Sequence, residues 1–156
     1  MRRSRAVAAL AVAAASCAGL ALLPQQAQAA GSIHLYKIYY DSPGSDRGAN
    51  SSLNAEYVQI KNSTRSAVQL KGYKVRDNAG FTYTFPSYKI SAGKTVKVHT
   101  GKGTKSAGHV YWDHRYGSRG WYVWNNDKDK ARLYNASGSL RDSCSYNSTR
   151  ADYKMC

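Results

Sequence analysis

Histidine and carboxylate side chains are the residues of this chain that could carry out acid–base chemistry. The four histidines are His34, His99, His109 and His114. None stands in a His-x-x-x-His, His-Glu or Cys-His arrangement that would predict a metal site. His99 or His114 paired with Glu56 would resemble the site of a secreted ribonuclease in residue type only, because no spacing selects a site. We therefore expect surface histidines, with His99 facing outward from a strand, and no catalytic residue.

Two loops rich in Asp and Asn could offer oxygen ligands to calcium. The candidate ligands are Asp41, Asp46 and Asn50 in one loop and Asn125, Asn126, Asp127 and Asp129 in the other. Calcium takes roughly six or more oxygens, whereas Asp and Asn are also common turn residues. Lys128 and Lys130 in the second loop oppose cation binding. The sequence favours turns over a metal site, and no cofactor is expected.

Basic side chains form the clearest functional pattern. Lys and Arg alternate with apolar residues in several predicted strands, which places the cations on one face of each strand. The candidate polyanion-binding residues are Lys74, Arg76, Lys97, His99, Lys102, Lys105, Arg115 and Arg119, and Lys130 and Arg132 alternate outward on a further strand. Such a surface can hold the backbone of an anionic polymer.

Aromatic residues are interleaved with the later cations and could stack on bases or sugars. They are Tyr111, Trp112, Tyr116 and Tyr122. The alternative is that the charges only keep an exported protein soluble and that the tyrosines pack on sheets. No recognition motif is present, so sequence-specific nucleic-acid recognition is not expected.

The first 29 residues have the layout of a secretory signal peptide. A basic start is followed by an Ala-rich apolar stretch, residues 6–23, and by the small-x-small pattern Ala27-Gln28-Ala29. This layout predicts cleavage after Ala29 and secretion to an extracellular location. A membrane anchor is the alternative for residues 6–23, and no second apolar stretch is long enough to span a membrane. Removing Arg2, Arg3 and Arg5 takes the formal net charge from +14 to +11.

The remaining chain, residues 30–156, has the size of one domain with its own core. It keeps two cysteines, Cys144 and Cys156. An even pair in an oxidising compartment predicts a disulfide bond, which would tie down a short polar C-terminal tail, residues 147–156. Closing a loop of this size would stabilise the fold by about 2–3 kcal/mol. The sequence alone leaves open whether the bond is intramolecular.

Short alternating runs rich in Tyr, Val, Ile and Thr recur between turn formers and predict an all-β protein. The runs cover residues 33–40, 56–62, 68–70, 73–77, 81–85, 95–100, 110–112 and 140–146. About eight or nine such strands suit an antiparallel β-sandwich. The expected core residues are Val58, Ile60, Leu70, Tyr73, Val75, Phe85, Ile90, Val96, Val98, Trp124 and Leu133.

Residues 121–134, WYVWNNDKDKARLY, read as a strand, a polar turn and a second strand. This pattern predicts a hairpin with Trp124 and Leu133 facing the core. A second segment, residues 41–52, is full of turn formers and is expected to be a loop too polar to bury.

An ordered set of segments resembles the lamin-tail domain of the secreted bacterial type. The segments are SLNAEYVQIKN (52–62), LKGYKVRD (70–77), FTYTFP (81–86), VKVHTGKGT (96–104) and WNNDKDKARLYNASG (124–138). The resemblance covers residues 33–146 and implies an immunoglobulin-like β-sandwich, and it does not imply an enzymatic activity. In nuclear lamins such a domain serves interactions with proteins and nucleic acid, and in bacteria it occurs on exported proteins.

These observations favour a secreted, non-enzymatic module that binds an anionic polymer, such as a cell-wall polymer or nucleic acid, or a protein partner. The alternative is a small secreted hydrolase such as a nuclease. An inhibitor or adhesion module is a third reading. A fold by itself does not decide among these functions.

Overall fold

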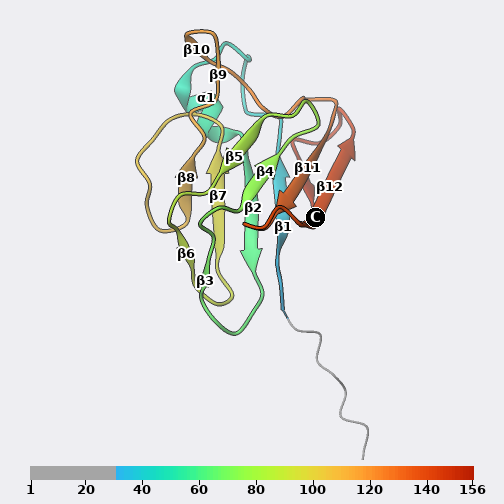
Figure 1. Cartoon of the computed structure of the whole chain (residues 1–156). Helices are drawn as coiled ribbons and strands as arrows, with labels where there is room; N and C mark the ends of the chain where they lie inside the picture. The colour runs from blue at the N-terminus through green and yellow to red at the C-terminus, as the bar shows by residue number, and fades with distance from the viewer. Residues whose placement is uncertain (1–30) are drawn as a thin grey trace, which may run out of the picture.

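The computed structural model describes residues 31–156 and shows two large β-sheets packed face to face, besides two two-stranded sheets (Figure 1). The five-stranded sheet has the order β13-β1-β2-β7-β8 and the four-stranded sheet the order β12-β11-β4-β5. The strands are β1 (Ile33–Tyr39), β2 (Tyr57–Asn62), β3 (Val68–Gln69), β4 (Lys74–Arg76), β5 (Thr82–Thr84), β6 (Lys89–Ile90), β7 (Thr95–His99), β8 (His109–Tyr111), β9 (Arg115–Tyr116), β10 (Arg119–Gly120), β11 (Lys128–Tyr134), β12 (Leu140–Asn147) and β13 (Tyr153–Met155). The predicted all-β, immunoglobulin-like sandwich is therefore confirmed.

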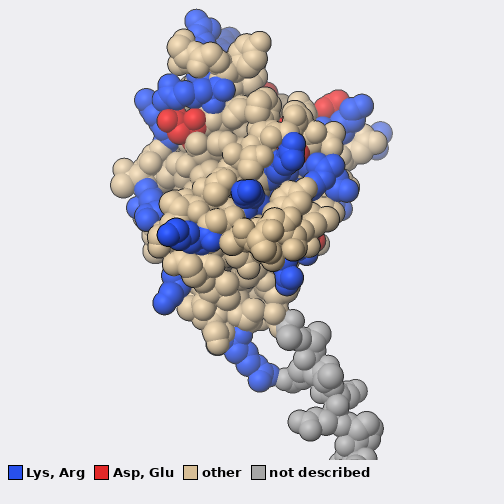
Figure 2. Space-filling view, viewed as in Figure 1, with Lys and Arg blue, Asp and Glu red and all other residues tan. Residues whose placement is uncertain are grey.

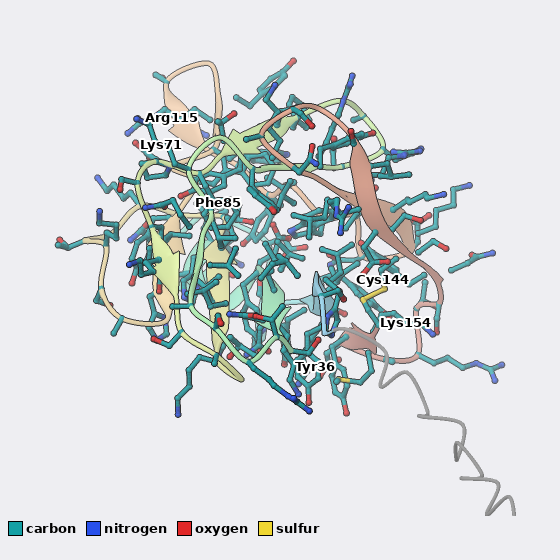
Figure 3. All side chains as sticks on the ribbon, turned by 60° about the horizontal axis from the view of Figure 1, so that its bottom comes forward. Tyr36, Lys71, Phe85, Arg115, Cys144 and Lys154 are labelled. Atoms are coloured by element: carbon teal, nitrogen blue, oxygen red, sulfur yellow. A yellow bond between two sulfur atoms is a disulfide. The ribbon has the colours of Figure 1, made fainter. Side chains whose placement is uncertain are left out.

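The strands form where apolar and polar residues alternate, because this pattern buries one face of each sheet. In β2, Val58 and Ile60 are fully buried while Tyr57, Gln59 and Lys61 stay partly exposed. All of the expected core residues are buried except Tyr73, which is partly buried and packs against the core. Phe85 lies between the two layers (Figure 3).

One strand pair departs from the antiparallel expectation. β8 pairs with β7 in parallel, with Val98 opposite Val110, whereas the other strand pairs are antiparallel. Because β8 runs in the same direction as β7, residues 100–108 have to return along the sheet edge. This return segment carries Lys102 and Lys105.

The predicted hairpin of residues 121–134 is wrong in its first arm. Trp124 and Leu133 do face the core, but the strand begins only at Lys128. The amides of Val123 and Trp124 donate to Oε1 of the buried Glu56, at 2.8 and 3.3 Å. Since a carboxyl oxygen of Glu56 satisfies these amides, they need no partner strand.

The loop predicted for residues 41–52 is also corrected. A short helix, α1 (Asn50–Ala55), begins inside it and buries Leu53, and Ser42 in the same segment is 2% exposed. The Ser42 hydroxyl is hydrogen-bonded to Ser52 at 2.8 Å, which satisfies this polar group in the interior.

The C-terminal tail is held by a strand as well as by the predicted disulfide bond. Cys144 of β12 is bonded to Cys156, and β13 pairs with the edge of β1, with Tyr153 opposite Tyr39. Figure 3 shows this disulfide beside Lys154 of β13. The bond is therefore intramolecular and joins the edges of the two sheets.

The predicted signal peptide, residues 1–29, lies outside the described residues. Within residues 31–156 no helix has the length and hydropathy needed to cross a membrane.

Candidate functional site: a basic sheet face

Cations gather on the outer face of the four-stranded sheet. β11 alternates strictly, with Asp129, Ala131 and Leu133 buried. The intervening cations therefore point away from the core, as do those on either side of Val75 in β4. We call this surface the basic face; its cations are Lys74, Arg76, Lys128, Lys130 and Arg132. Figure 2 shows many more Lys and Arg than Asp and Glu side chains on this side of the molecule.

The pairing of β4 with β11 places two arginines opposite each other. Arg132 is in register with Arg76, and Lys74 with Tyr134. Arg132 is held by hydrogen bonds from its guanidinium to the Asp77 carbonyl, at 3.3 Å, and to Asn78 Oδ1, at 3.1 Å. Like charges at directly opposite positions destabilise a sheet pair, so a bound anion would relieve this repulsion.

Two carboxylates near the basic face, those of Asp77 and Asp129, are buried and bonded to amides. Asp129 accepts hydrogen bonds from the backbone amides of Asn78 and Asn125. Asp77 is 1% exposed and accepts one from Gly80. Burial is the main cause that raises the pKa of Asp77 above its usual value. Within residues 31–156 no salt bridge neutralises a cation of the basic face, so its positive charge is available to a ligand.

Two hollows lie along this face. One of about 430 Å³ is lined by Lys74, Arg76, Thr82, Thr84, Tyr134 and Gly138. The other, of about 600 Å³, is lined by Asn78, Ala79, Asn125, Lys128, Asp129, Lys130, Ser145, Tyr146 and Asn147. Both combine cations with hydroxyl or amide groups, which is the chemistry needed to bind phosphate, sulfate or carboxylate oxygens.

The other predicted polyanion-binding cations are not brought to this face. Lys97 lies on the outer side of the five-stranded sheet, and Lys102 and Lys105 lie in the segment between β7 and β8. Arg115 and Arg119 lie on the β9–β10 ribbon, which projects beyond α1 (Figure 1). The predicted set is therefore divided among the basic face and three other places on the molecule.

Arg115 is partly neutralised, because it forms a salt bridge of 3.1 Å with Asp113. Lys105 also has a partner, since its ammonium donates to the Ser87 carbonyl at 3.2 Å. Arg115 is therefore less available to a ligand than the cations of the basic face, which form no salt bridge within residues 31–156.

The prediction that His99 is exposed is wrong. His99 lies on the outer side of β7, opposite Tyr57, but it is 8% exposed. Its Nδ1 is 2.6 Å from the carbonyl of Asn54 in α1, and its Nε2 is 2.8 Å from Nδ1 of His109. Burial lowers the pKa of His99. The helix that covers it was not predicted, so strand alternation alone misplaced it.

The structure does not assemble the acid–base pair considered for a hydrolase. Glu56 is fully buried, and its hydrogen bonds come from Thr100 and the backbone amides described above. His114 is buried against Phe81, with ring centroids 4.4 Å apart, and burial lowers its pKa. Neither His99 nor His114 is hydrogen-bonded to Glu56 among the described residues.

The two Asp- and Asn-rich loops meet through an amide. Asn126 Nδ2 donates to Asp41 at 3.2 Å and to Asp46 at 2.8 Å. In the described part of the chain, no three His, Cys, Asp or Glu side chains are grouped so that they could hold a metal ion. The carboxylates of the first loop thus bind the second loop, whereas Asp129 accepts hydrogen bonds from Asn125 within its own turn.

The predicted polyanion-binding set lacks Lys128, Lys130 and Arg132 of the basic face; Lys130 and Arg132 were expected to face outward, whereas Lys128 was not. It was read as part of a turn, yet it begins β11 on the same face as Lys130 and Arg132. In the segment KDKAR, residues 128–132, a cation stands at every second position. This alternation places Lys128 on the same strand face as Lys130 and Arg132, whereas the prediction included Lys128 in the turn.

Comparison with known proteins identifies the family. The family model of the lamin tail domain matches residues 26–148, which is more than half of the chain. The match includes β1 to β12 and thus both sheets except β13. No curated protein matches the sequence. The chain belongs to the lamin tail domain family.

Proposed function

We propose that this protein is a secreted, non-enzymatic module that holds an anionic polymer on its basic face. The observation that carries the proposal is the set of cations on β4 and β11, which face outward without a salt bridge in residues 31–156. Binding would work by contact of phosphate, sulfate or carboxylate groups with these cations and by release of counterions.

Export is part of this proposal. It rests on the signal-like layout of residues 1–29 and on the disulfide between Cys144 and Cys156, a bond typical of oxidising compartments. The secreted bacterial type of the family is the corresponding subgroup. Outside the cell, anionic wall polymers and released nucleic acid are both candidate ligands, and a protein with an acidic surface is the alternative partner.

The hydrolase alternative has less support. It needs a histidine and Glu56 within reach of a common substrate, whereas Glu56 is fully buried and bonded to backbone amides. Incubation of the pure mature chain with RNA and DNA tests it, because turnover that is lost in a His114→Ala variant would replace the binding proposal.

The test of the binding proposal is the salt dependence of affinity for heparin and for a short DNA duplex. The variant Lys74→Gln, Arg76→Gln, Lys130→Gln removes three cations of the basic face. Its matched control, Lys89→Gln, Lys94→Gln, Lys154→Gln, removes three exposed lysines elsewhere. We expect the first variant to bind DNA more weakly, with a slope of log K against log salt that is smaller by about 0.9 per lost contact.

The control variant should bind with nearly the wild-type slope. Equal weakening by both variants would mean that only net charge matters and would overturn the basic face as the site. Binding by the wild type that does not weaken with salt would refute the electrostatic mechanism.

A further inference from the structure

A row of tyrosines crosses the outer face of the five-stranded sheet, on the opposite side of the sandwich from the basic face. Tyr153 of β13 is in register with Tyr39 of β1, and Tyr39 with Tyr57 of β2. The ring centroids are 6.1 and 5.5 Å apart, and the rings are inclined by only 16° and 21°. At these separations the rings are offset rather than in full face-to-face contact. We call Tyr39, Tyr57 and Tyr153 the tyrosine platform.

Beyond Tyr57 the row continues but is covered. His99 is opposite Tyr57 and lies under α1, and Tyr111 stacks on His99 at 5.0 Å. A Cβ on Gly103 would come within 2.4 Å of the Tyr111 ring, so the 100–108 segment packs directly on that ring. The open part of the row is therefore the platform, where Tyr153 is 46% exposed.

Lysines occupy the ring faces of the platform. Lys37 Nζ lies 4.3 Å from the ring centroid of Tyr153, and Lys97 Nζ lies 4.2 Å from that of Tyr57. Both lysines lie in the neighbouring row of outward-facing residues across the strands, where Lys37, Gln59 and Lys97 are in register. Both lysines are partly exposed, and cation–π contacts near the protein surface are weak, so the ammonium groups can leave the rings for a phosphate group, which binds them more strongly.

The two sides of the tyrosine row carry opposite charge. On one side lie Lys37 and Lys97, and Lys61 lies in the next row of outward-facing residues. On the other side lie Asp41 and Asp152, and burial together with the neighbouring Asp152 carboxylate raises the pKa of Tyr39. A polyanion backbone would therefore run on the lysine side, parallel to the row and across the strands.

We propose that the tyrosine platform binds single-stranded nucleic acid by exchange. The phosphates would take the ammonium groups of Lys37 and Lys97, and the bases would replace these groups on the ring faces of Tyr57 and Tyr153. Stacking on aromatic rings is tolerant of sequence because every base has a π-face. A duplex keeps its bases stacked internally and cannot make this exchange. The platform is separate from the basic face, so this proposal does not depend on the proposed function.

The experiment compares two strands that have the same phosphates. A labelled oligothymidylate of about 15 nucleotides and an abasic strand of equal length are titrated with the mature chain, and fluorescence anisotropy gives Kd. We expect the wild type to bind the thymidylate at least about tenfold more tightly. The variant Tyr39→Leu, Tyr57→Leu, Tyr153→Leu should bind both strands equally. The matched variant with phenylalanine at the same positions keeps the rings and should keep the preference.

Each remaining outcome decides the question. Equal wild-type affinity for the two strands, or a preference that survives in the leucine variant, would overturn the platform. If the leucine variant lost affinity for hyaluronate as strongly as for thymidylate, the surface would recognise sugar rings instead, and the proposal would be wrong. Tyr153→Leu alone, at an exposed edge position, gives a mild variant should the triple variant not fold.

Loss of three cations from the basic face should weaken binding of the abasic strand more than binding of the thymidylate, because the tyrosines of the platform remain, so the preference for the thymidylate should persist. The leucine variant therefore tests the platform, and the variant that lacks three cations tests the basic face.

Discussion

Glu56 shows how a single buried carboxyl group organises this fold. Its side chain is fully buried, and Oε1 accepts hydrogen bonds from the Thr100 hydroxyl and from the amides of Val123 and Trp124. Oε2 has no hydrogen-bond partner in the described part of the chain. Burial is the largest effect and raises the pKa of Glu56 to about 8, because the charged form is poorly solvated there. Glu56 is thus an uncharged acceptor that holds the Trp124 segment.

Glu56 should make the protein less stable as pH rises from about 4.5 to about 8. In this window the folded state keeps a proton that the unfolded state releases, so the free energy of unfolding falls by up to about 1.4 kcal/mol per pH unit. The variant Glu56→Gln keeps the acceptor oxygen and cannot ionise. Urea unfolding should show that the variant gains stability relative to wild type between pH 5 and pH 8.

Asp127→Asn, a change at an exposed carboxylate, serves as the control and should follow the wild-type pH profile in this window. Parallel profiles for Glu56→Gln and wild type would show that Glu56 does not take up a proton on folding.

At the scale of elements, β13 depends on the disulfide bond. All three of its residues are exposed, and it pairs only with the edge of β1 among the described strands. A strand so short buries little apolar surface, so its own packing does not hold it in place. The bond from Cys156 to Cys144 fixes its end, and the Cys156 amide also donates to the Tyr36 carbonyl at 3.0 Å.

The double variant Cys144→Ser, Cys156→Ser should lower Tm by about 10 °C. The bond closes a loop between residues 12 positions apart, which corresponds to about 3 kcal/mol on the chain-entropy argument. Calorimetry of residues 30–156 measures the shift, and hydrogen exchange should show faster exchange in β13. Reduced wild type should match the double variant, which should itself be insensitive to reductant. An unchanged Tm would mean that β13 is held without the bond.

On the scale of the whole molecule, the sandwich separates two cationic surfaces. The basic face covers the four-stranded sheet and the tyrosine platform covers the five-stranded sheet, with the shared core between them. The net charge of the chain without residues 1–29 is +11, so polyanions are attracted from both sides. One molecule therefore offers two sites that face in opposite directions.

If both proposals hold, one protein molecule should bridge two nucleic-acid strands. Two populations of short oligothymidylates, of about ten nucleotides, carry a donor and an acceptor dye. Energy transfer should appear when protein is added at half the strand concentration and should vanish in excess protein, where each strand has its own molecule. The basic-face variant should still bind strands through the platform without transfer. Transfer that persists in this variant would show bridging by self-association instead.

Much of the fold is readable from the sequence because strand alternation is a local property. The pattern of Val58, Ile60, Val96 and Val98 identifies buried faces without any knowledge of the partner strands. A disulfide at Cys144 and Cys156 and the family were likewise predicted from the chain itself, although only the structure shows that the bond is intramolecular. The candidate site was predicted only in part, since the outward direction of Lys74, Arg76, Lys130 and Arg132 follows from alternation whereas their proximity does not.

Sequence by itself determined which residues face inward or outward and that the chain is a disulfide-bonded β-sandwich. Only the tertiary structure decided which outward residues meet. The pairing of β4 with β11 places Arg76 opposite Arg132, and the pairing of β13, β1 and β2 aligns the three tyrosines. In the tertiary structure α1 also covers His99, and the Glu56 carboxyl group accepts a hydrogen bond from the amide of Val123, which was predicted to lie in the first strand of a hairpin. The physical reason is that alternation has a period of about two residues, while strand pairing and covering depend on contacts between residues far apart in the chain.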